Sequence, residues 1–181
     1  MLPLSVFRPA GAALLLGLTA CSTAPATEET GHRVTYNDFE AVDGWGPAVP
    51  SLTTEKAHSG RFAVKVDNAV EYSLGYANLL GKASTARMRK LTVRGWARRE
   101  GPDGSATLVV QVTDPAQGNQ QLYWEPLHFA EQVKTPGQWE QISKEYTLPA
   151  GLQASHELKV YLWRNSAAQP AYLDDLTITA E

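Results

Sequence analysis

Two aromatic residues and a lysine alternate with aliphatic residues near the C-terminus, in the run LKVYLW at 158–163. A β-strand directs successive side chains to opposite faces, so this run predicts one aliphatic face and one polar and aromatic face. Aromatic rings beside hydrogen-bonding groups on a non-core face are typical of a ligand-binding surface. The side chains on that face are Lys159, Tyr161 and Trp163.

Two other segments show the same alternation. In 91–98 two arginines and a tryptophan alternate with small or aliphatic residues, and in 107–113 a glutamine lies on the side opposite the core valines. We therefore expect the three segments to present one common non-core face. The six predicted ligand-binding residues are Arg94, Trp96, Arg98, Gln111, Tyr161 and Trp163.

No arrangement in the chain is typical of catalysis. The histidines lack the His-Glu-x-x-His spacing of a metalloprotease, and there is no Gly-x-Ser-x-Gly elbow and no phosphate-binding loop. The sequence therefore predicts that the protein is not an enzyme, with no catalytic residue. The four histidines are His32, His58, His128 and His156.

Short strands separated by turns account for nearly all of the chain after residue 60. Glycine and proline clusters such as 101–104, 114–119 and 149–151 separate the runs, and no stretch has a convincing helical period. Many short strands with such turns indicate an all-β fold, an antiparallel two-sheet sandwich or a barrel. The predicted strands are 61–66, 91–98, 107–113, 121–129, 139–148, 158–163 and 172–179.

The first 20 residues have the features of a signal peptide. Arg8 is their only charge, and the apolar run is shorter than the about 20 residues that a membrane span needs. The sequence Leu-Thr-Ala-Cys at 18–21 resembles the bacterial lipobox, in which the cysteine is lipidated. An ordinary signal peptide with an unmodified Cys21 is the alternative. Because Ser22 rather than aspartate follows the cysteine, the resemblance implies a lipid-anchored protein of the cell envelope, at the outer membrane.

The remaining chain divides into a tether and one domain. Residues 21–33 are small, polar and proline-containing, which predicts a flexible tether. Residues 34–181 are long enough for a single domain with a sizeable core. The net charge is −3, or −4 once Arg8 is removed, and no basic stripe runs along any segment, so we do not expect nucleic acid as a partner.

A series of short motifs runs through the domain in order. The series is similar to the jelly-roll carbohydrate-binding modules of the family 4, 9 and 22 type, within the galactose-binding-like superfamily. The resemblance implies a jelly-roll β-sandwich that binds polysaccharide or oligosaccharide on its concave sheet. The motifs are NDFE at 37–40, GW at 44–45, AHSGRFAV at 57–64, LTVRGWAR at 91–98, GQW at 137–139 and YLDDL at 172–176.

The resemblance also implies a structural calcium ion at the edge of the sandwich. Its ligands by position are Glu40 and Asp174, with carbonyl groups of the turn 57–60, and carboxylate and carbonyl oxygens are what calcium prefers. The alternative is that both carboxylates accept hydrogen bonds from amides of the turn. The six face residues match the positions that contact sugar in the family. The arginine pair favours an acidic polysaccharide, because guanidinium groups suit carboxylates.

Other aromatic residues are considered for packing and for the binding groove. We assign Trp45 and Trp139 to packing, because large rings are mostly buried. For Tyr72 and Tyr76 we expect a place outside the groove, and a place at its border is the alternative. Tyr123 and Trp124 are adjacent, so one of them must face outward. A structural or protein-interaction module that has lost its sugar site is the alternative function, because binding modules usually accompany a catalytic domain on the same chain.

Overall fold

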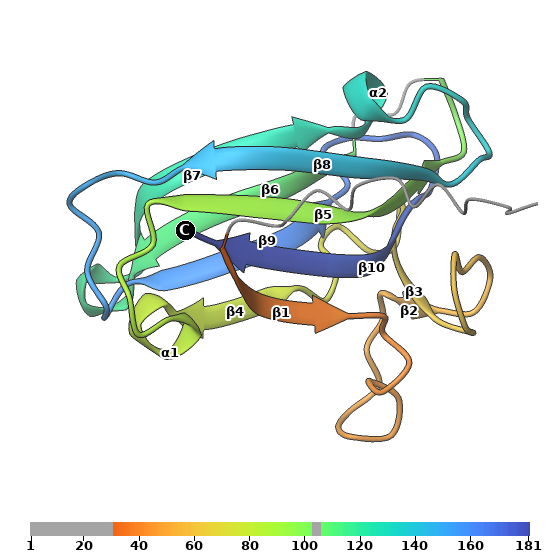
Figure 1. Cartoon of the computed structure of the whole chain (residues 1–181). Helices are drawn as coiled ribbons and strands as arrows, with labels where there is room; N and C mark the ends of the chain where they lie inside the picture. Colours follow the sequence, from red (N-terminus) through yellow and green to blue (C-terminus); the bar gives the residue numbers. More distant parts are fainter. Residues whose placement is uncertain (1–30, 103–105) are drawn as a thin grey trace, which may run out of the picture.

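Two antiparallel β-sheets packed face to face form the domain (Figure 1). The computed structural model describes residues 31–102 and 106–181. The predicted antiparallel two-sheet sandwich is therefore confirmed. The predicted signal peptide, Cys21 and all of the tether up to residue 30 lie outside the described residues. Within the described part of the chain, no helix has the length and apolar character needed to cross a membrane.

The larger sheet, called sheet A here, has six strands. Its order is β2-β3-β10-β5-β8, and β1 also pairs with β10. β10 therefore lies between β5 on one side and both β3 and β1 on the other. The strands of sheet A are β1 (His32–Asn37), β2 (Leu52–Thr53), β3 (Ala63–Val66), β5 (Lys90–Arg99), β8 (Glu140–Thr147) and β10 (Ala171–Ala180).

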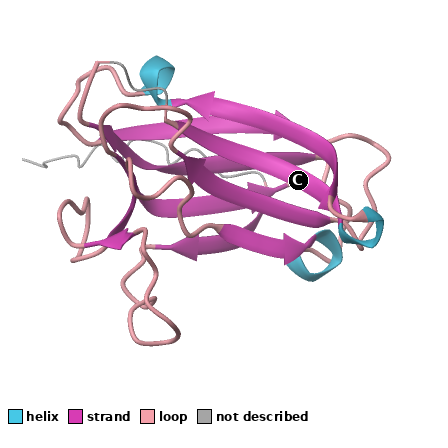
Figure 2. Ribbon diagram, turned by 180° about the vertical axis from the view of Figure 1, so that it is seen from behind, coloured by secondary structure: helices cyan, strands magenta, loops and turns pink. Residues whose placement is uncertain are grey.

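The smaller sheet, sheet B, has four strands in the order β4-β9-β6-β7. They are β4 (Tyr76–Leu79), β6 (Thr107–Asp114), β7 (Gln120–His128) and β9 (Glu157–Trp163). Three short helical turns lie at the ends of the sandwich (Figure 2). They are α1 (Leu80–Ala83), the 3-10 turn η1 (Pro115–Gln117) and α2 (Phe129–Gln132).

The core lies between the two sheets and follows the alternation in the sequence. Along β5 and β9 every second residue is buried, while the residues between them are half-buried on the outer faces. Burial of each such aliphatic side chain contributes about 1.5–3 kcal/mol, which fixes the faces of these strands. Fully buried core residues include Leu91, Val93 and Ile142 of sheet A and Leu108, Val110, Leu158, Val160 and Leu162 of sheet B.

A bulge interrupts β10 at its middle. The register of β10 against β5 shifts between Asp174 and Thr177, and Asp175 has a left-handed φ of 50°. On the other side of β10, residues up to Leu173 pair with β3, and residues from Leu176 pair with β1. The bulge thus lies where β10 changes partner, with Asp174 still paired to Trp96 of β5 and Asp175 outside the ladder.

All seven predicted strands are present, with ends shifted by at most two residues. β1, β2 and β4 were not predicted, because they are short and show no clear alternation. β1 begins at His32, inside the segment expected to be tether.

Candidate functional site

Three aromatic side chains form a cluster on the outer face of sheet B, which we call the aromatic cluster: Tyr72, Tyr161 and Trp163. Tyr161 and Trp163 come from β9, and Tyr72 joins them through an isolated β-bridge to Trp163. The rings of Tyr72 and Trp163 are stacked, with centroids 6.3 Å apart and planes 15° apart, and Tyr72 meets Tyr161 edge-on at 5.8 Å. Because Tyr72 is 57% exposed, the cluster offers ring surface to a ligand.

Glu71 holds the tryptophan of the cluster in place. The indole Nε1 of Trp163 donates a hydrogen bond to Glu71 Oε1 at 2.7 Å, and Arg164 Nε donates to Oε2 at 2.8 Å. The hydrogen bond from Arg164, followed by that from Trp163, lowers the pKa of the Glu71 carboxyl. Glu71 is therefore ionised at neutral pH and fixes the indole ring plane from outside the sheet. Sequence reasoning missed Glu71, because only the bridge between distant segments reveals its role.

Hydrogen-bonding groups lie beside the aromatic cluster on β6 and β7. The phenol of Tyr161 donates to Gln111 Oε1 at 3.2 Å, and Gln111 Nε2 donates to Gln121 Oε1 at 3.3 Å. Trp124 pairs with Gln111 across the sheet and is 37% exposed, whereas Tyr123 packs against the core. Of the two adjacent aromatics, Trp124 is the one that faces outward. The outer face of sheet B thus combines rings with amide groups that can bind hydroxyls.

Gly75 allows the segment before β4 to approach Tyr161 closely. A Cβ atom at Gly75 would lie 2.3 Å from the carbonyl oxygen of Val160 and 2.7 Å from the Cβ of Tyr161. Any other residue would push this segment away from β9. The chain from Ser73 to Tyr76 therefore runs beside the aromatic cluster, of which Tyr72 is itself a member. Tyr76 is partly buried and packs against the core.

The other three predicted face residues lie on the opposite side of the sandwich. Arg94, Trp96 and Arg98 belong to β5 and face outward from sheet A, while Gln111, Tyr161 and Trp163 face outward from sheet B. The expectation of one common face is therefore wrong. Alternation identifies the non-core side of each strand, but it does not tell which sheet a strand joins.

On sheet A, the side chains of the β5 set are engaged with neighbours. Trp96 stacks on His58, with ring centroids 3.8 Å apart and planes 11° apart. Arg98 Nε donates to Glu100 Oε1 at 2.7 Å. Trp139 contacts the rings of His58 and Tyr172 edge-on, which agrees with its predicted packing role. The arginines therefore do not lie beside the aromatic cluster, and the argument for an acidic polysaccharide on that face is lost.

Trp45 is not a packing residue. Its side chain is 89% exposed, on the loop after β1 that extends away from the sandwich (Figure 1). Gly44 and Gly46 flank it, and both have open space around the position of a Cβ atom. The ring was predicted to be buried from residue type alone, and the glycine-rich loop carries it outward instead.

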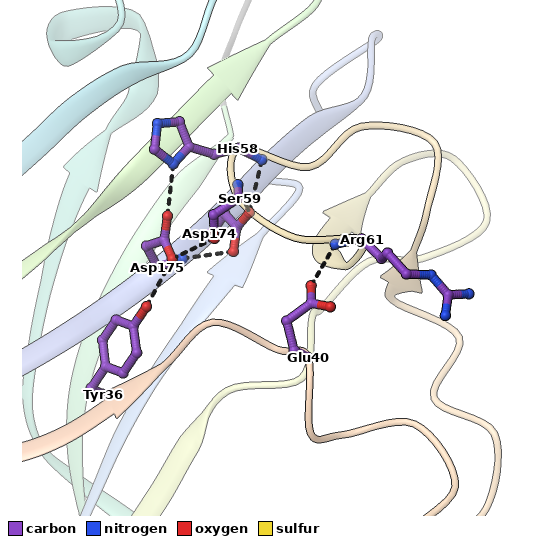
Figure 3. A network of polar contacts seen from close by, with 7 residues as sticks. All are labelled: Tyr36, Glu40, His58, Ser59, Arg61, Asp174 and Asp175. Carbon is purple, nitrogen blue, oxygen red and sulfur yellow. Dashed lines mark hydrogen bonds and ion pairs between the residues drawn. The ribbon is translucent and has the colours of Figure 1, made fainter.

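The acidic residues of the sandwich edge bind a turn of the backbone. Asp174 Oδ2 accepts hydrogen bonds from the amides of His58 at 2.8 Å and Ser59 at 3.1 Å. Glu40 Oε1 accepts from the amide of Arg61 at 2.7 Å (Figure 3). The same oxygen accepts from the amide of Phe62 at 2.7 Å. Asp174 therefore holds the start of the segment 58–62, and Glu40 holds its end.

These contacts match the alternative that was left open for the calcium ligands. Burial raises the pKa of Asp174, and the amides of Ser59 and His58 partly offset the shift. The oxygen donors suit calcium in type. No three His, Cys, Asp or Glu side chains cluster in residues 31–102 and 106–181, so any further ligands would be backbone carbonyl groups or water. A calcium site at Glu40 and Asp174 stays a prediction.

Asp175 lies at the centre of a second network on the outer face of sheet A. Its carboxylate accepts hydrogen bonds from the Tyr36 phenol at 3.0 Å and the Ser59 hydroxyl at 2.9 Å, and it contacts His58 Nδ1 at 2.7 Å (Figure 3). Burial opposes ionisation, but the hydrogen bonds from His58, Ser59 and Tyr36 outweigh it and lower the pKa of Asp175. The bulge of β10 thus directs its two carboxylates to different groups of the same turn. Asp174 binds the backbone amides of His58 and Ser59, and Asp175 binds their side chains.

The fold and the aromatic cluster can be compared with known proteins. Residues 31–168 match the family model described as a carbohydrate binding domain. The chain belongs to this family. The matched range includes the aromatic cluster and Glu71, and it ends before Asp174 and Asp175 of the edge networks. The family is one of binding domains rather than catalytic ones.

Relatives of this carbohydrate-binding domain include a xylanase. Over 160 residues the chain is 27% identical to endo-1,4-beta-xylanase A of Thermotoga maritima, a match that covers 84% of this chain and 14% of the xylanase. The chain therefore corresponds to a small part of that enzyme.

Two solved structures have the same fold. The CBM22-1 xylan-binding domain of Paenibacillus barcinonensis Xyn10C superposes with a TM-score of 0.50 at 16% identity, over 83% of this chain and 95% of that one. The CBM22-2 xylan-binding domain of the same protein gives a TM-score of 0.51 at 17% identity, over 82% of this chain and 99% of that one. At such identity, these structures establish a shared fold.

Proposed function

We propose that the outer face of sheet B binds a polysaccharide chain without cleaving it. The observation that carries this proposal is the aromatic cluster, in which three rings from two distant segments share one exposed face beside the amides of Gln111 and Gln121. Rings stack on the apolar faces of sugar units, and amides bind hydroxyl groups as both donor and acceptor. Membership of the carbohydrate-binding family supports this assignment.

Xylan is the first polysaccharide to test. The two Paenibacillus barcinonensis domains of similar fold are xylan-binding domains, and the Thermotoga maritima relative is an endo-1,4-beta-xylanase. A neutral chain also suits this face. The charged groups near the cluster are paired with each other, Arg164 with Glu71 and Lys159 with Glu157.

The experiment is a binding assay with soluble polysaccharides. Native electrophoresis of the purified protein through gels that contain xylan, β-glucan or polygalacturonate would measure retardation by each polymer. We expect retardation by a neutral β-linked polymer, its loss in Tyr161→Ala, and no release of reducing ends from the polymer. Equal mobility in all gels would contradict binding. Reducing ends released by the wild-type protein would show that the polymer is cleaved and would contradict a purely binding function.

We also propose that Cys21 anchors this domain to a membrane through lipid. The support is the lipobox-like segment at 18–21 and the tether that follows. More than one acyl chain is needed for a stable anchor, since each buried methylene contributes about 0.8 kcal/mol. Cys21→Ala is expected to move the full chain from the membrane fraction to the soluble fraction, with Ser22→Ala as a matched control that stays in the membrane. A Cys21→Ala protein that remains with membranes after a high-salt wash would contradict the anchor.

A further inference from the structure

A depression lies on the outer face of sheet A, across β1, β5, β8 and β10. Its volume is about 370 Å³, which is within the range of sites for small ligands. The hydrophobic core separates it from the aromatic cluster on sheet B. The side chains that line it and carry the argument are Tyr36, Arg94, Trp96, Gln141, Asp175 and Thr177.

Strand register brings these side chains together from four strands. Trp96 of β5 pairs with Gln141 of β8, and the next outward residue of β5, Arg94, pairs with Thr177 of β10. Thr177 in turn pairs with Tyr36 of β1. One row across the sheet therefore carries an indole ring and an amide, and the next carries a guanidinium group, a hydroxyl and a phenol. The lining rests on regular strands, which hold a site more accurately than loops do.

Contacts behind the depression fix its walls. Trp96 is stacked on His58, and the phenol of Tyr36 donates to Asp175 at 3.0 Å. Asp175 is held from the other side by His58 and Ser59. Burial, followed by the hydrogen bond to Asp175, raises the pKa of Tyr36 to about 12, so its hydroxyl group stays protonated at neutral pH. A site with fixed walls loses little conformational freedom on binding.

The lining groups select the chemistry of a ligand. The guanidinium of Arg94 and the carboxylate of Asp175 have opposite charges, so the depression favours neither an anion nor a cation. An apolar ligand would leave the amide of Gln141 and the hydroxyl of Thr177 without partners, which is costly. A sugar unit has hydroxyl groups that both donate and accept, and an apolar ring face that can lie against an indole.

From this geometry we infer that the outer face of sheet A is a second saccharide site, which binds one or two units of a neutral glycan. The site is independent of the aromatic cluster on sheet B. A chain with binding surfaces on opposite faces can hold two glycan chains at once, and two sites on one domain raise its avidity for an insoluble polymer. The Trp96 and Arg94 predicted as ligand contacts would then serve this second site.

The test follows the indole N–H signals of the five tryptophans in a ¹H–¹⁵N spectrum, each assigned by a single substitution. The probes are xylohexaose, cellohexaose and, as an acidic comparison, hexagalacturonate. We expect a neutral hexasaccharide to shift the Trp96 signal saturably in the wild-type protein and equally in Trp163→Ala. The double variant Gln141→Ala/Thr177→Val should weaken the response of Trp96 at least roughly tenfold and leave that of Trp163 unchanged. Thr147→Ala, an exposed change at the far end of β8 where the strand pairs with Lys90, is the matched control that should alter neither.

The outcomes separate the two sites. A Trp163 signal that moves while Trp96 stays fixed with both neutral probes would overturn the second site and leave the proposed function intact. A Trp96 signal that moves while Trp163 stays fixed would support the second site and overturn the assignment of the aromatic cluster. A larger response of Trp96 to hexagalacturonate than to the neutral probes would overturn the neutral ligand.

Discussion

Replacing Trp163 with alanine tests whether its ring serves the ligand or the core. The indole is half-buried, stacked on Tyr72 and bonded to Glu71, so its loss is not neutral for the fold. The aromatic pair contributes about 0.5–1.5 kcal/mol, whereas truncation of a fully buried ring costs about 3–5 kcal/mol. For a domain of this size the smaller loss lowers the melting temperature by roughly 2–6 °C. We therefore expect a folded Trp163→Ala protein with a modest decrease in melting temperature.

The loss of binding should be larger than the loss of stability. A tryptophan at the centre of a binding surface commonly contributes about 2 kcal/mol or more, which corresponds to a roughly 30-fold increase in the dissociation constant. Calorimetric titration with xylohexaose and a thermal melt of the same sample measure both quantities. All samples carry Gln141→Ala/Thr177→Val, which removes the contribution of the proposed sheet A site. Trp139→Ala, which removes a ring from the sheet A side, is the matched control and should lower the melting temperature without changing this affinity. If Trp163→Ala unfolds the protein, or binds as tightly as the wild type, the reasoning is wrong.

Four further changes probe other parts of the molecule. Glu71→Ala frees the indole of Trp163 and should weaken oligosaccharide binding, measured by calorimetry, while Glu71→Gln keeps the acceptor and should retain most of it. The hydroxyl of Tyr146 is buried without a hydrogen-bond partner among the described residues, so Tyr146→Phe should stabilise the protein in urea by up to about 1–3 kcal/mol. The pKa of Asp175 is lowered in the folded state, so its contribution to stability is present above pH 3.8. That contribution is lost as the pH falls through the lower folded pKa. The melting temperature of Asp175→Asn should therefore decrease less steeply with acidification than that of the wild type. The calcium hypothesis predicts that millimolar calcium raises the melting temperature by several degrees and that Asp174→Ala abolishes the gain. Identical melting curves with calcium and with chelator would contradict it, and hydrogen bonding to amides would then be the role of Asp174.

The sequence was sufficient to predict seven of the ten strands in the described residues, but not their assignment to sheets. Alternation correctly identified which residues of β5, β6 and β9 face away from the core, because burial of aliphatic side chains fixes the face of each strand. The same alternation is silent on strand order, which depends on long-range pairing. For that reason Trp96 was grouped with Trp163, although the core separates them.

Side chains outside regular strands were the least predictable. Trp45 was expected to pack because of its size, but its loop turns it outward. The role of Glu71 depends on a bridge between segments 91 positions apart, from Tyr72 to Trp163, and no local pattern signals it. Asp174 binds the backbone amides of the turn and Asp175 binds its side chains, and this division depends on a bulge that appears only where β10 changes from β3 to β1.

The central claim is that sugar binds on the outer face of sheet B, and a crystal structure of the complex with xylohexaose tests it most directly. The account predicts sugar rings against Tyr161 and Trp163, with hydroxyl groups hydrogen-bonded to Gln111. An occupied depression on sheet A in the same crystals would be consistent with the second site. A bound hexasaccharide that leaves the aromatic cluster of sheet B empty would contradict the account.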